Sequence, residues 1–268
     1  MISFPLAKIN LALSVVSKRP DGFHDLETIF YPLPFRDILE VVPAGKTSFI
    51  QSGFPVPGNP DDNLVLRAYH LLEKKYPRIT PMQIFLHKVI PMGSGLGGGS
   101  SDAAAMIQLV SRYFDLPASR EELLGYALEL GSDCPFFMQT SPCFATGRGE
   151  ILEPVELDLS GYSILLIHPE IQINTAWAFS KMQPAVSVFD LKESISAPIQ
   201  NWEKTLHNDF EKPVFNEYPA LRTIKKQLYQ AGALYASMTG SGSTLYGIFP
   251  KDAKPVLHIE NAGQTFIR

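Results

Sequence analysis

Every second residue from Ile9 to Val15 is apolar, and the positions between them are smaller or polar. Successive side chains of a β-strand point to opposite faces, so this alternation predicts a strand. A turn is expected at residues 20–22, because the glycine there tolerates a positive φ. Two further strands are expected at about 25–33 and 37–43. Together the three strands predict an antiparallel β unit.

Helical spacing appears after residue 60. The stretch 52–60 is rich in Pro, Gly, Ser and Asn and predicts a loop. Residues 61–63 then start a helix whose apolar residues recur three or four positions apart, at Leu64, Ala68, Leu71 and Leu72. A strand is expected at 82–88, and a helix of strong helix formers from about Ser101 to about Phe114.

Two shorter helices are predicted next. Ser119 and Glu122 form a capping box, and Gly131 is suited to end the helix that they start. Another helix is expected near Asp133, because Pro135 is tolerated in a first helical turn.

The second half of the chain mixes strands and helices. Strands are expected at 162–168, 233–237 and 243–249, and helical stretches near 175–182, 198–206 and 218–230. The chain shows no regular alternation of strand and helix, so the predicted class is α+β. With 268 residues, two domains are expected, at 1–155 and 156–268.

Composition narrows the classes of protein. The formal net charge of −4 argues against a general polyanion binder, so no nucleic-acid partner is expected. Only Cys134 and Cys143 occur, which favours two free thiols over a disulfide framework. The N-terminus lacks the features of a signal peptide, and no apolar run approaches the length of a membrane span. The expected location is the cytoplasm, with no membrane partner.

Five glycines lie within the seven residues from Gly93 to Gly99. Glycine weakens regular structure by about 0.5–1 kcal/mol per residue, so this density favours a close approach of backbone to a ligand. With a strand before it and a helix after it, the loop predicts a phosphate site; a flexible linker is the plainer alternative.

Three other phosphate motifs fit less well. A Walker A motif needs a lysine directly after the glycines, and none is present. A dinucleotide fingerprint needs an acid at a strand end about 20 residues later, whereas Glu121 and Glu122 begin a helix. A protein-kinase loop would be accompanied by H-R-D and D-F-G segments, and neither occurs. An oxidoreductase of the dinucleotide-binding kind is therefore a distant alternative.

Three segments, in this order, resemble the motifs of the GHMP kinases. They are Pro5–Leu13, the glycine loop Pro91–Ser101 with Asp102–Ala104, and Met238–Ser243. The resemblance covers nearly the whole chain. It implies a two-lobed α+β GHMP kinase fold, with an N-terminal lobe like domain 2 of ribosomal protein S5 and a ferredoxin-like α/β C-terminal lobe.

Four further segments resemble one group within this family, whose members phosphorylate a cytidine-diphosphate-linked methylerythritol. They are Arg19–Leu26, Gly131–Phe137, Gly147–Glu150 and Asn208–Glu211. The resemblance implies transfer of the ATP γ-phosphoryl group to the 2-hydroxyl of this small-molecule substrate, in the non-mevalonate isoprenoid pathway. A kinase for another alcohol, such as mevalonate or homoserine, is the nearest alternative, and a non-catalytic ligand-binding protein of the same fold is another. A monomer or weak homodimer is expected.

The resemblance implies roles for two charged residues. Asp133 is the candidate catalytic base for the substrate hydroxyl, although an aspartate in this position also suits a helix N-cap. Lys8 is its candidate partner, because a nearby cation keeps a carboxylate ionised and stabilises developing negative charge. A lone lysine on a strand is otherwise a solvated charge.

For ATP, the expected phosphate ligands are the backbone N–H groups of the glycine loop. Asn63 matches a family position near adenine, and otherwise it is a helix cap. Mg²⁺ is implied by the nucleotide, with a hydroxyl of Ser100 or Ser101 as a candidate ligand, but no acidic metal cage can be recognised. The candidate ATP residues are thus Asn63, Pro91, Met92, Gly93, Ser94, Gly95, Leu96, Gly97, Gly98, Gly99, Ser100 and Ser101.

For the second substrate, the resemblance implies that Phe23 and Phe179 stack on cytosine and that His24 bonds its edge. Stacking is worth about 1–3 kcal/mol per base. The family often has Tyr in place of Phe23, so a contact from that hydroxyl is absent here; plain core packing is the alternative for either Phe. Asn10, on the strand of Lys8, and Thr239 and Gly240, in the third motif, complete the candidate substrate residues.

Overall fold

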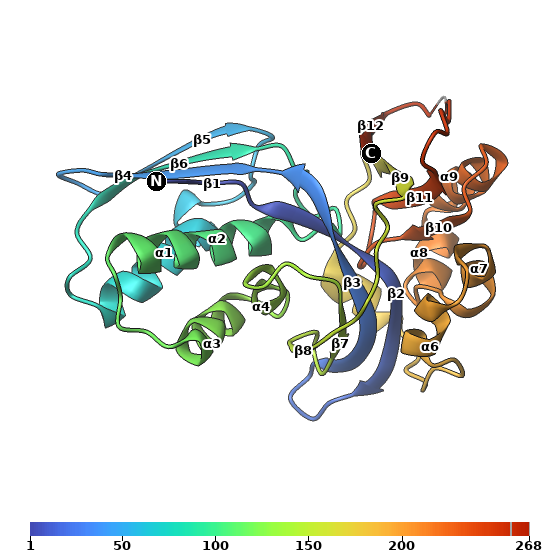
Figure 1. The fold of residues 1–268 in the computed structure, drawn as a ribbon, viewed down its shortest axis with the longest axis horizontal. Helices are drawn as coiled ribbons and strands as arrows, with labels where there is room; N and C mark the ends of the chain where they lie inside the picture. Colours follow the sequence, from blue (N-terminus) through green and yellow to red (C-terminus); the bar gives the residue numbers. More distant parts are fainter. Residues whose placement is uncertain (258, 268) are drawn as a thin grey trace. The chain divides into compact units, whose positions relative to one another are not determined.

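The computed structural model describes residues 1–257 and 259–267, and its chain divides into two compact units. The first unit comprises residues 1–8, 32–92 and 97–141, and the second comprises 9–31, 93–96 and 142–268. Both units contain helices and strands, in agreement with the predicted α+β class (Figure 1). The boundary expected at residue 155 stays a prediction, since each unit gathers several stretches of chain.

The first unit is a four-stranded sheet with helices on one face. The strand order is β1 (Ile2–Ser3), β4 (Ile38–Pro43), β6 (Met82–Lys88) and β5 (Ser48–Gly53), with β5 and β6 parallel. The 3₁₀ helix η1 (Pro60–Asp62) leads into α1 (Leu64–Lys75), which packs with α2 (Gly98–Tyr113) against the sheet (Figure 1). Helices α3 (Arg120–Leu130) and α4 (Cys134–Phe137) complete the unit.

This core follows directly from the alternation along β4 and β6. Leu39 and Val41 of β4 and Ile84 of β6 point to the same buried face, where they meet Tyr69 of α1 and Met106 of α2. The predicted helix at 64 and the predicted strand at 82–88 are both confirmed.

The second unit holds two sheets. One has the order β2 (Leu6–Lys18), β3 (His24–Arg36), β7 (Cys143–Thr146), β8 (Ile151–Pro154). The other has the order β10 (Tyr235–Met238), β11 (Leu245–Pro250), β9 (Tyr162–Pro169), β12 (Ala262–Ile267). The first residues of β2 and the last residues of β3 belong to the first unit.

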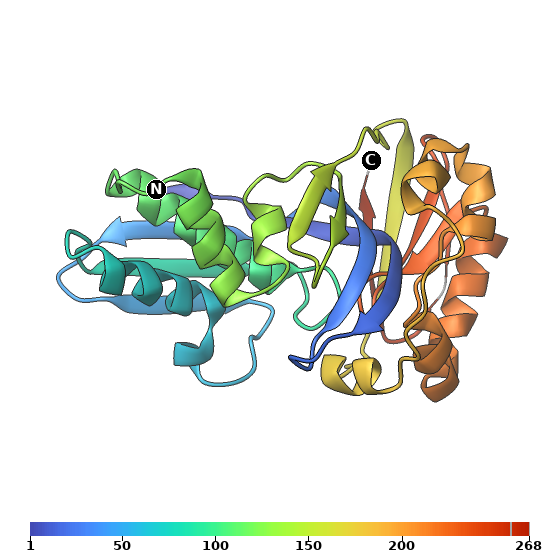
Figure 2. The ribbon, with the colours of Figure 1, turned by 90° about the horizontal axis from the view of Figure 1, so that it is seen from below.

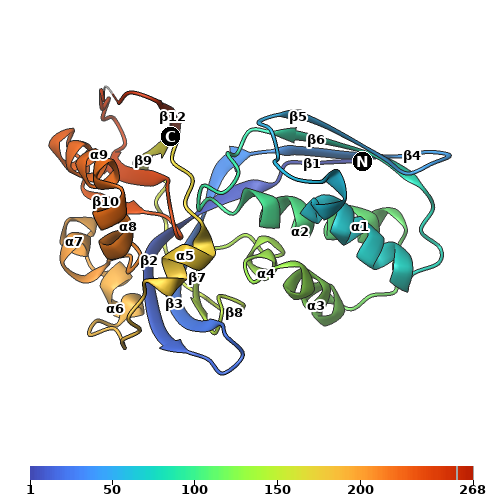
Figure 3. The same ribbon diagram turned by 180° about the vertical axis from the view of Figure 1, so that it is seen from behind.

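Helices of the second unit cover the β9–β12 sheet. They include α8 (Glu211–Glu217) and α9 (Pro219–Gln230), whose Leu221, Ile224 and Leu228 pack with Leu165 and Phe249 (Figure 2). The remaining helices are α5 (Thr175–Ser180), α6 (Leu191–Ser196), η2 (Ile199–Asn201) and α7 (Trp202–Thr205). Figure 3 shows α5 beside the hairpin of β2 and β3.

One predicted grouping of strands is wrong. The strand at 37–43 does not join the sheet of β2 and β3, because β4 pairs with β1 and β6 instead. Asp37 separates β3 from β4, and its carboxylate accepts hydrogen bonds from the backbone N–H groups of Val89 and Ile90. The predicted strands themselves are present.

Candidate active site

The predicted catalytic pair lies in the first unit. Lys8 is on β2, and Asp133 directly precedes α4. Nζ of Lys8 lies 3.5 Å from Oδ2 of Asp133. The Lys8 side chain is 4% exposed, whereas the Asp133 side chain is 34% exposed. The cation is thus buried, and the carboxylate remains accessible to a substrate.

Asp133 does not play its alternative role, that of a helix cap. Asp133 occupies the N-cap position of α4, but its side chain makes no capping hydrogen bond. N-cap aspartates normally accept a hydrogen bond from the second or third helical N–H group. Since the carboxylate faces Lys8 instead, it does not act as a cap here.

The environment of Lys8 is tightly packed. Burial lowers the pKa of Lys8, and the opposite charge of Asp133 counteracts that effect. Gly97 lies against the lysine stem, because a Cβ at this position would stand 3.1 Å from Cγ of Lys8 and 2.8 Å from Cζ of Phe137. Glycine at position 97 therefore allows the loop, β2 and α4 to approach one another.

The second half of the glycine loop forms the start of α2. Gly97 is the N-cap in a left-handed conformation, with φ of 73°, and the helix begins at Gly98. The expected start near Ser101 is thus three residues too late. The first N–H groups of a helix have no intrahelical acceptor and carry the positive end of the helix dipole. The helix end at residues 98–100 is therefore of the kind that favours a negatively charged ligand.

The first half of the loop packs against the third motif in the second unit. A Cβ at Gly95 would stand 2.1 Å from the carbonyl oxygen of Thr239, so only glycine fits there. The Thr239 hydroxyl lies 3.1 Å from the carbonyl oxygen of Gly95, and the N–H of Thr244 donates to the carbonyl oxygen of Ser94. The glycine loop, which is predicted to bind phosphates, is thus in contact with the third motif, which is predicted to bind the substrate.

Asn10 connects the third motif to β2 and β3. Its Nδ2 donates to the Thr28 hydroxyl at 2.8 Å, and its Oδ1 accepts from the N–H of Gly240 at 3.0 Å. Its backbone N–H donates to the Thr239 hydroxyl at 3.0 Å. The Asn10 side chain is buried, so it holds the Thr239–Gly240 turn in place.

Two further residues that fix this turn were not assigned a role from the sequence. Asn208 donates from Nδ2 to the carbonyl oxygens of Met238 and Gly240, at 2.7 and 2.8 Å. Glu211 accepts from the N–H of Met238 at 2.9 Å. Both belong to the quoted segment Asn208–Glu211, where polar residues surround a single Phe. That pattern distinguishes the segment from its surroundings, but it does not predict the hydrogen bonds to Met238 and Gly240.

His24 and Phe179 are stacked, with ring centroids 4.9 Å apart and an interplanar angle of 20°. Phe210 meets Phe179 edge-on at 4.9 Å. Burial, with a smaller contribution from the charge of Lys18, lowers the pKa of His24. A neutral imidazole offers one donor and one acceptor, which suits the edge of a base.

Phe23 does not join this stack. Phe23 is 51% exposed, and the guanidinium of Arg148 lies 4.7 Å from its ring centroid. Nε of Arg148 also lies 3.6 Å from Oε1 of Glu150. Arg148 lies in Gly147–Glu150, one of the segments that resemble the family, but no sequence signal predicts its contact with Phe23, because the two residues are far apart in the chain.

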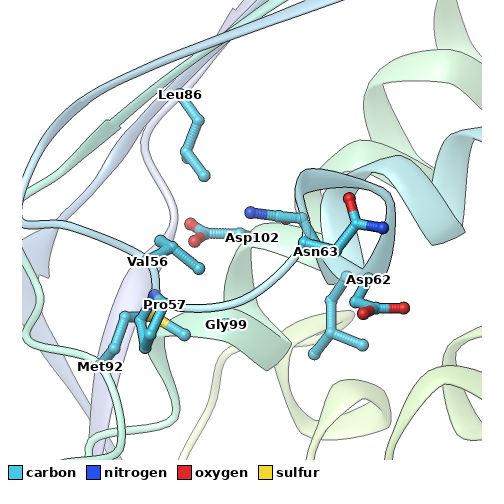
Figure 4. Close-up of a pocket in the computed structure, with 10 residues that line it drawn as sticks. Val56, Pro57, Asp62, Asn63, Leu86, Met92, Gly99 and Asp102 are labelled. Carbon is cyan, nitrogen blue, oxygen red and sulfur yellow. The ribbon is translucent and has the colours of Figure 1, made fainter.

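Asn63 lines a cavity of about 150 Å³ in the first unit (Figure 4). Asn63 also caps α1, because its Oδ1 accepts from the N–H of Val65 at 2.9 Å. Apolar side chains dominate the lining, and the glycine segment contributes Met92 and Gly99. The lining residues are Val56, Pro57, Asn59, Asp62, Asn63, Leu64, Leu86, Met92, Gly99 and Asp102.

A buried charge cluster adjoins this cavity and was not anticipated. Lys88 on β6 forms ion pairs with Asp37 and, at 2.7 Å, with Asp102 of α2. All three side chains are almost fully buried. A strand lysine and two distant aspartates show no sign of this grouping in the sequence.

The other predicted ATP residues are also part of the loop and of the first turns of α2. Ser94, Leu96 and Ser101 are buried, whereas Pro91 and Ser100 are half-buried.

Among residues 1–257 and 259–267, no group of three His, Cys, Asp or Glu side chains could hold a metal ion. Nor does any helix in the described part of the chain have the length and apolar character to cross a bilayer.

Comparison with known proteins shows which family the chain belongs to. The model of the GHMP kinase N-terminal domain matches residues 63–140, and that of the GHMP kinase C-terminal domain matches residues 191–262. A 4-diphosphocytidyl-2-C-methyl-D-erythritol kinase of Bacteroides fragilis is 48% identical over 258 residues, which cover 95% of this chain and 94% of that protein. The chain belongs to the GHMP kinases, in the 4-diphosphocytidyl-2-C-methyl-D-erythritol kinase group.

Other relatives agree with this membership. The kinase of the same description from Azobacteroides pseudotrichonymphae is 50% identical and covers 96% of both chains. A crystal structure of 4-(cytidine 5'-diphospho)-2C-methyl-D-erythritol kinase matches with a TM-score of 0.80 at 30% identity, over 92% of this chain and 90% of that one. A homoserine kinase structure from Cytophaga hutchinsonii, with a TM-score of 0.67 at 14% identity over 97% and 93%, shares the fold alone. The predicted GHMP kinase fold is therefore confirmed.

Proposed function

We propose that this kinase transfers the γ-phosphoryl group of ATP to the 2-hydroxyl of 4-diphosphocytidyl-2-C-methyl-D-erythritol, with Asp133 as base and Lys8 as its partner. Membership of the family makes it a phosphotransferase with an alcohol acceptor. The observation that carries the residue roles is the pair of Lys8 and Asp133, 3.5 Å apart, with only the carboxylate exposed.

The reaction needs one proton transfer and one phosphoryl transfer. Asp133 accepts the proton of the substrate hydroxyl as its oxygen forms a bond to the γ-phosphorus, and the bond from that phosphorus to the β–γ bridging oxygen breaks to release ADP. Catalysis of phosphoryl transfer consists mainly of positioning and charge stabilisation. Lys8 supplies a cation in a poorly hydrated position, where it acts more strongly than in water.

The nucleotide is proposed to bind along the glycine loop and the cavity beside it. The N–H groups at the start of α2 suit the phosphates, and the mostly apolar cavity at Asn63 suits the adenine base. Mg²⁺ prefers oxygen ligands and keeps several waters, so one serine hydroxyl would be a suitable protein ligand beside the phosphates. Ser100 and Ser101, in the first turns of α2, offer such a hydroxyl, and the ion would neutralise charge on the phosphates.

The cytosine of the acceptor is proposed to bind in the second unit. His24 is already stacked on Phe179, so its ring edge is held in a fixed orientation for hydrogen bonds to the base. Phe23 offers a half-exposed ring for stacking, and its opposite face is occupied by Arg148. Cytoplasmic location and a monomeric or weakly dimeric state remain part of the proposal.

The test is ADP release by the purified protein with one alcohol at a time. We expect turnover with the cytidine-linked methylerythritol, and at least about 100-fold lower kcat/KM with mevalonate or homoserine, since a site built for a polar base leaves its groups unpaired with either. Turnover with mevalonate or homoserine alone would refute the assigned acceptor. ATP binding without turnover on any of the three would instead favour a non-catalytic protein.

A further inference from the structure

His168 is a histidine of the second unit to which the proposed mechanism gives no role. It is half-buried and lies on β9, the strand between β11 and β12 (Figure 1). The pairing of β9 with β11 begins at Ile167 and Leu245, so Thr244 stands beside His168 just beyond the last pair. Nδ1 of His168 lies 3.1 Å from the Thr244 hydroxyl. This side-chain hydrogen bond therefore extends the contact between the two strands by one residue.

Thr244 in turn holds the glycine loop. Thr244 is fully buried, and its N–H donates to the carbonyl oxygen of Ser94 at 3.2 Å. Its own carbonyl oxygen accepts from the N–H of Thr239 at 3.0 Å. Thr244 thus connects His168 to the third motif and to the first half of the loop, and all of these residues belong to the second unit.

The carbonyl group of Ser94 determines the direction of the N–H group that follows it. A trans peptide is planar, and its C=O and N–H bonds point in opposite directions. The N–H of Gly95 therefore points away from Thr244, and it has no acceptor in the described part of the chain. Gly95 has a φ of 81°, and glycine adopts positive and negative φ about equally readily. Without the hydrogen bond from Thr244, this peptide would be free to turn over.

We propose that His168 is a positioning residue for the phosphates of the nucleotide: by fixing Thr244, it keeps the N–H of Gly95 turned toward them. An N–H group attracts a phosphate oxygen, whereas the carbonyl oxygen of a reversed peptide would repel it. A threonine hydroxyl both donates and accepts, so its bond to His168 does not depend on which ring nitrogen carries the proton. The inference rests on the proposed function only in that the phosphates of ATP bind at the glycine loop; it does not depend on which alcohol is phosphorylated.

The experiment is calorimetric binding of ATP and of inorganic triphosphate, each without acceptor. His168→Leu removes the ring nitrogens and keeps a side chain of comparable size, so both dissociation constants should rise about three- to tenfold, the effect of one lost hydrogen bond. His168→Asn places an amide near the position of Nδ1, and it should restore both constants to within about twofold of the wild-type values, because an amide can donate or accept. A role in folding alone would lower the free energy of unfolding and leave both constants of the folded protein unchanged.

A double-mutant cycle tests whether His168 acts through Thr244. Thr244→Val removes the hydroxyl and keeps the backbone N–H. If the two residues act through one contact, His168→Leu combined with Thr244→Val should bind ATP no more weakly than the weaker-binding single variant. His207→Leu is the matched control and should leave ATP affinity unchanged, since the ring of this exposed histidine of the same unit lies 3.4 Å from Asp209.

Three results would each overturn the inference: wild-type affinities in His168→Leu, equal defects in His168→Leu and His168→Asn, or additive effects in the double variant. The comparison of His168→Leu with His168→Asn changes nothing at the buried Thr244, so it stands even if Thr244→Val folds poorly. Absence of ATP binding by the wild-type protein would refute the proposed function together with this inference. The predicted loss of ATP affinity in His168→Leu, with no turnover of the cytidine substrate by the wild-type protein, would refute the proposed function alone.

Discussion

Lys8 and Lys88 are two buried lysines of the same unit, and each lies against a glycine of the same loop. A Cβ at Gly97 would stand 3.1 Å from the Lys8 stem, and one at Gly98 would stand 3.1 Å from Nζ of Lys88. Their counter-charges differ. Lys8 has Asp133 at 3.5 Å, with the carboxylate partly in solvent, whereas Lys88 contacts two carboxylates that are both buried.

The difference separates a pair suited to chemistry from a cluster suited to holding structure. A carboxylate that accepts a proton must be reachable by substrate, and the 34% exposed side chain of Asp133 meets this condition. Lys88 satisfies Asp37 and one oxygen of Asp102, and so it ties β6 to α2. Burial therefore does not distinguish Lys8, the proposed catalytic lysine, from Lys88, whereas the exposure of the carboxylate partner does.

The largest effect is expected for Asp133→Asn. The variant removes the proposed base while keeping the shape of the side chain, so kcat should fall by about 10³- to 10⁴-fold, near the upper end for general base catalysis. ATP affinity should change by less than about threefold, because the backbone of the glycine loop is untouched. Single-turnover kinetics and ATP binding measure the two quantities.

Glu129→Gln, at an exposed acid of α3, is the matched control and should leave both quantities unchanged. Near-normal turnover of Asp133→Asn would show that the open pair is not the reacting pair.

The next effect concerns stability. Lys88→Met leaves Asp37 and Asp102 buried without their cation, and breaking one side of a buried ion pair typically costs about 3–5 kcal/mol. Urea denaturation should show this loss in the free energy of unfolding. Lys74→Met, at an exposed position in the last turn of α1, should cost less than about 1 kcal/mol. Equal effects of the two changes would contradict the structural role of the cluster.

Lys8→Met should have the opposite effect to Lys88→Met, with a large loss of activity and a small loss of stability. Removing one preorganised electrostatic group from an active site typically costs about 10²- to 10³-fold in kcat. The free energy of unfolding should change far less than in Lys88→Met, because Asp133 stays partly hydrated when its partner is lost. A loss of stability as large as that of Lys88→Met, with kcat preserved in the folded fraction, would erase the distinction between the two lysines.

The sequence predicts local features well wherever a few adjacent residues decide the outcome. The alternation from Ile9 to Val15 yields β2, and the capping box at Ser119 yields α3 with both of its hydrogen bonds. The density of glycines predicts the loop but not the exact first residue of α2, because a glycine at position 97 can belong to the loop or act as the N-cap. Its left-handed conformation decides in favour of the cap.

The sequence does not predict strand pairings and side-chain clusters that join residues far apart in the chain. Pairing of β4 with β6 joins residues that lie 39 to 49 positions apart in the chain, from Pro43 with Met82 to Ile38 with His87, and no local pattern encodes it. The same applies to the cluster of Asp37, Lys88 and Asp102. Asp102 directly follows the glycine loop in the second motif, but nothing in the sequence connects it to Lys88 or to Asp37. Lys8 and Asp133 were paired only through resemblance to family motifs; their 3.5 Å distance is a property of the folded unit.

The smallest effect is expected at Arg148 and Phe23, where the cation and its partner are both accessible to solvent. Phe23→Ala removes the proposed stacking surface and should raise KM for the cytidine substrate by a factor corresponding to about 1–3 kcal/mol, with KM for ATP unchanged. Arg148→Met removes only the cation above the ring, worth about 0.5–1 kcal/mol at an exposed site, and should raise the same KM by about two- to fivefold.

Arg148→Lys keeps a cation over the ring and should recover part of that loss, whereas a purely structural role in the turn before β8 would give equal defects for Lys and Met. Neither change at Arg148 should lower the free energy of unfolding by more than about 1 kcal/mol, because the pair remains hydrated. The comparison of the two lysines implies that the exposure of the partner determines whether a cation serves binding and chemistry or stabilises the fold. An effect on stability comparable to that of Lys88→Met would contradict this.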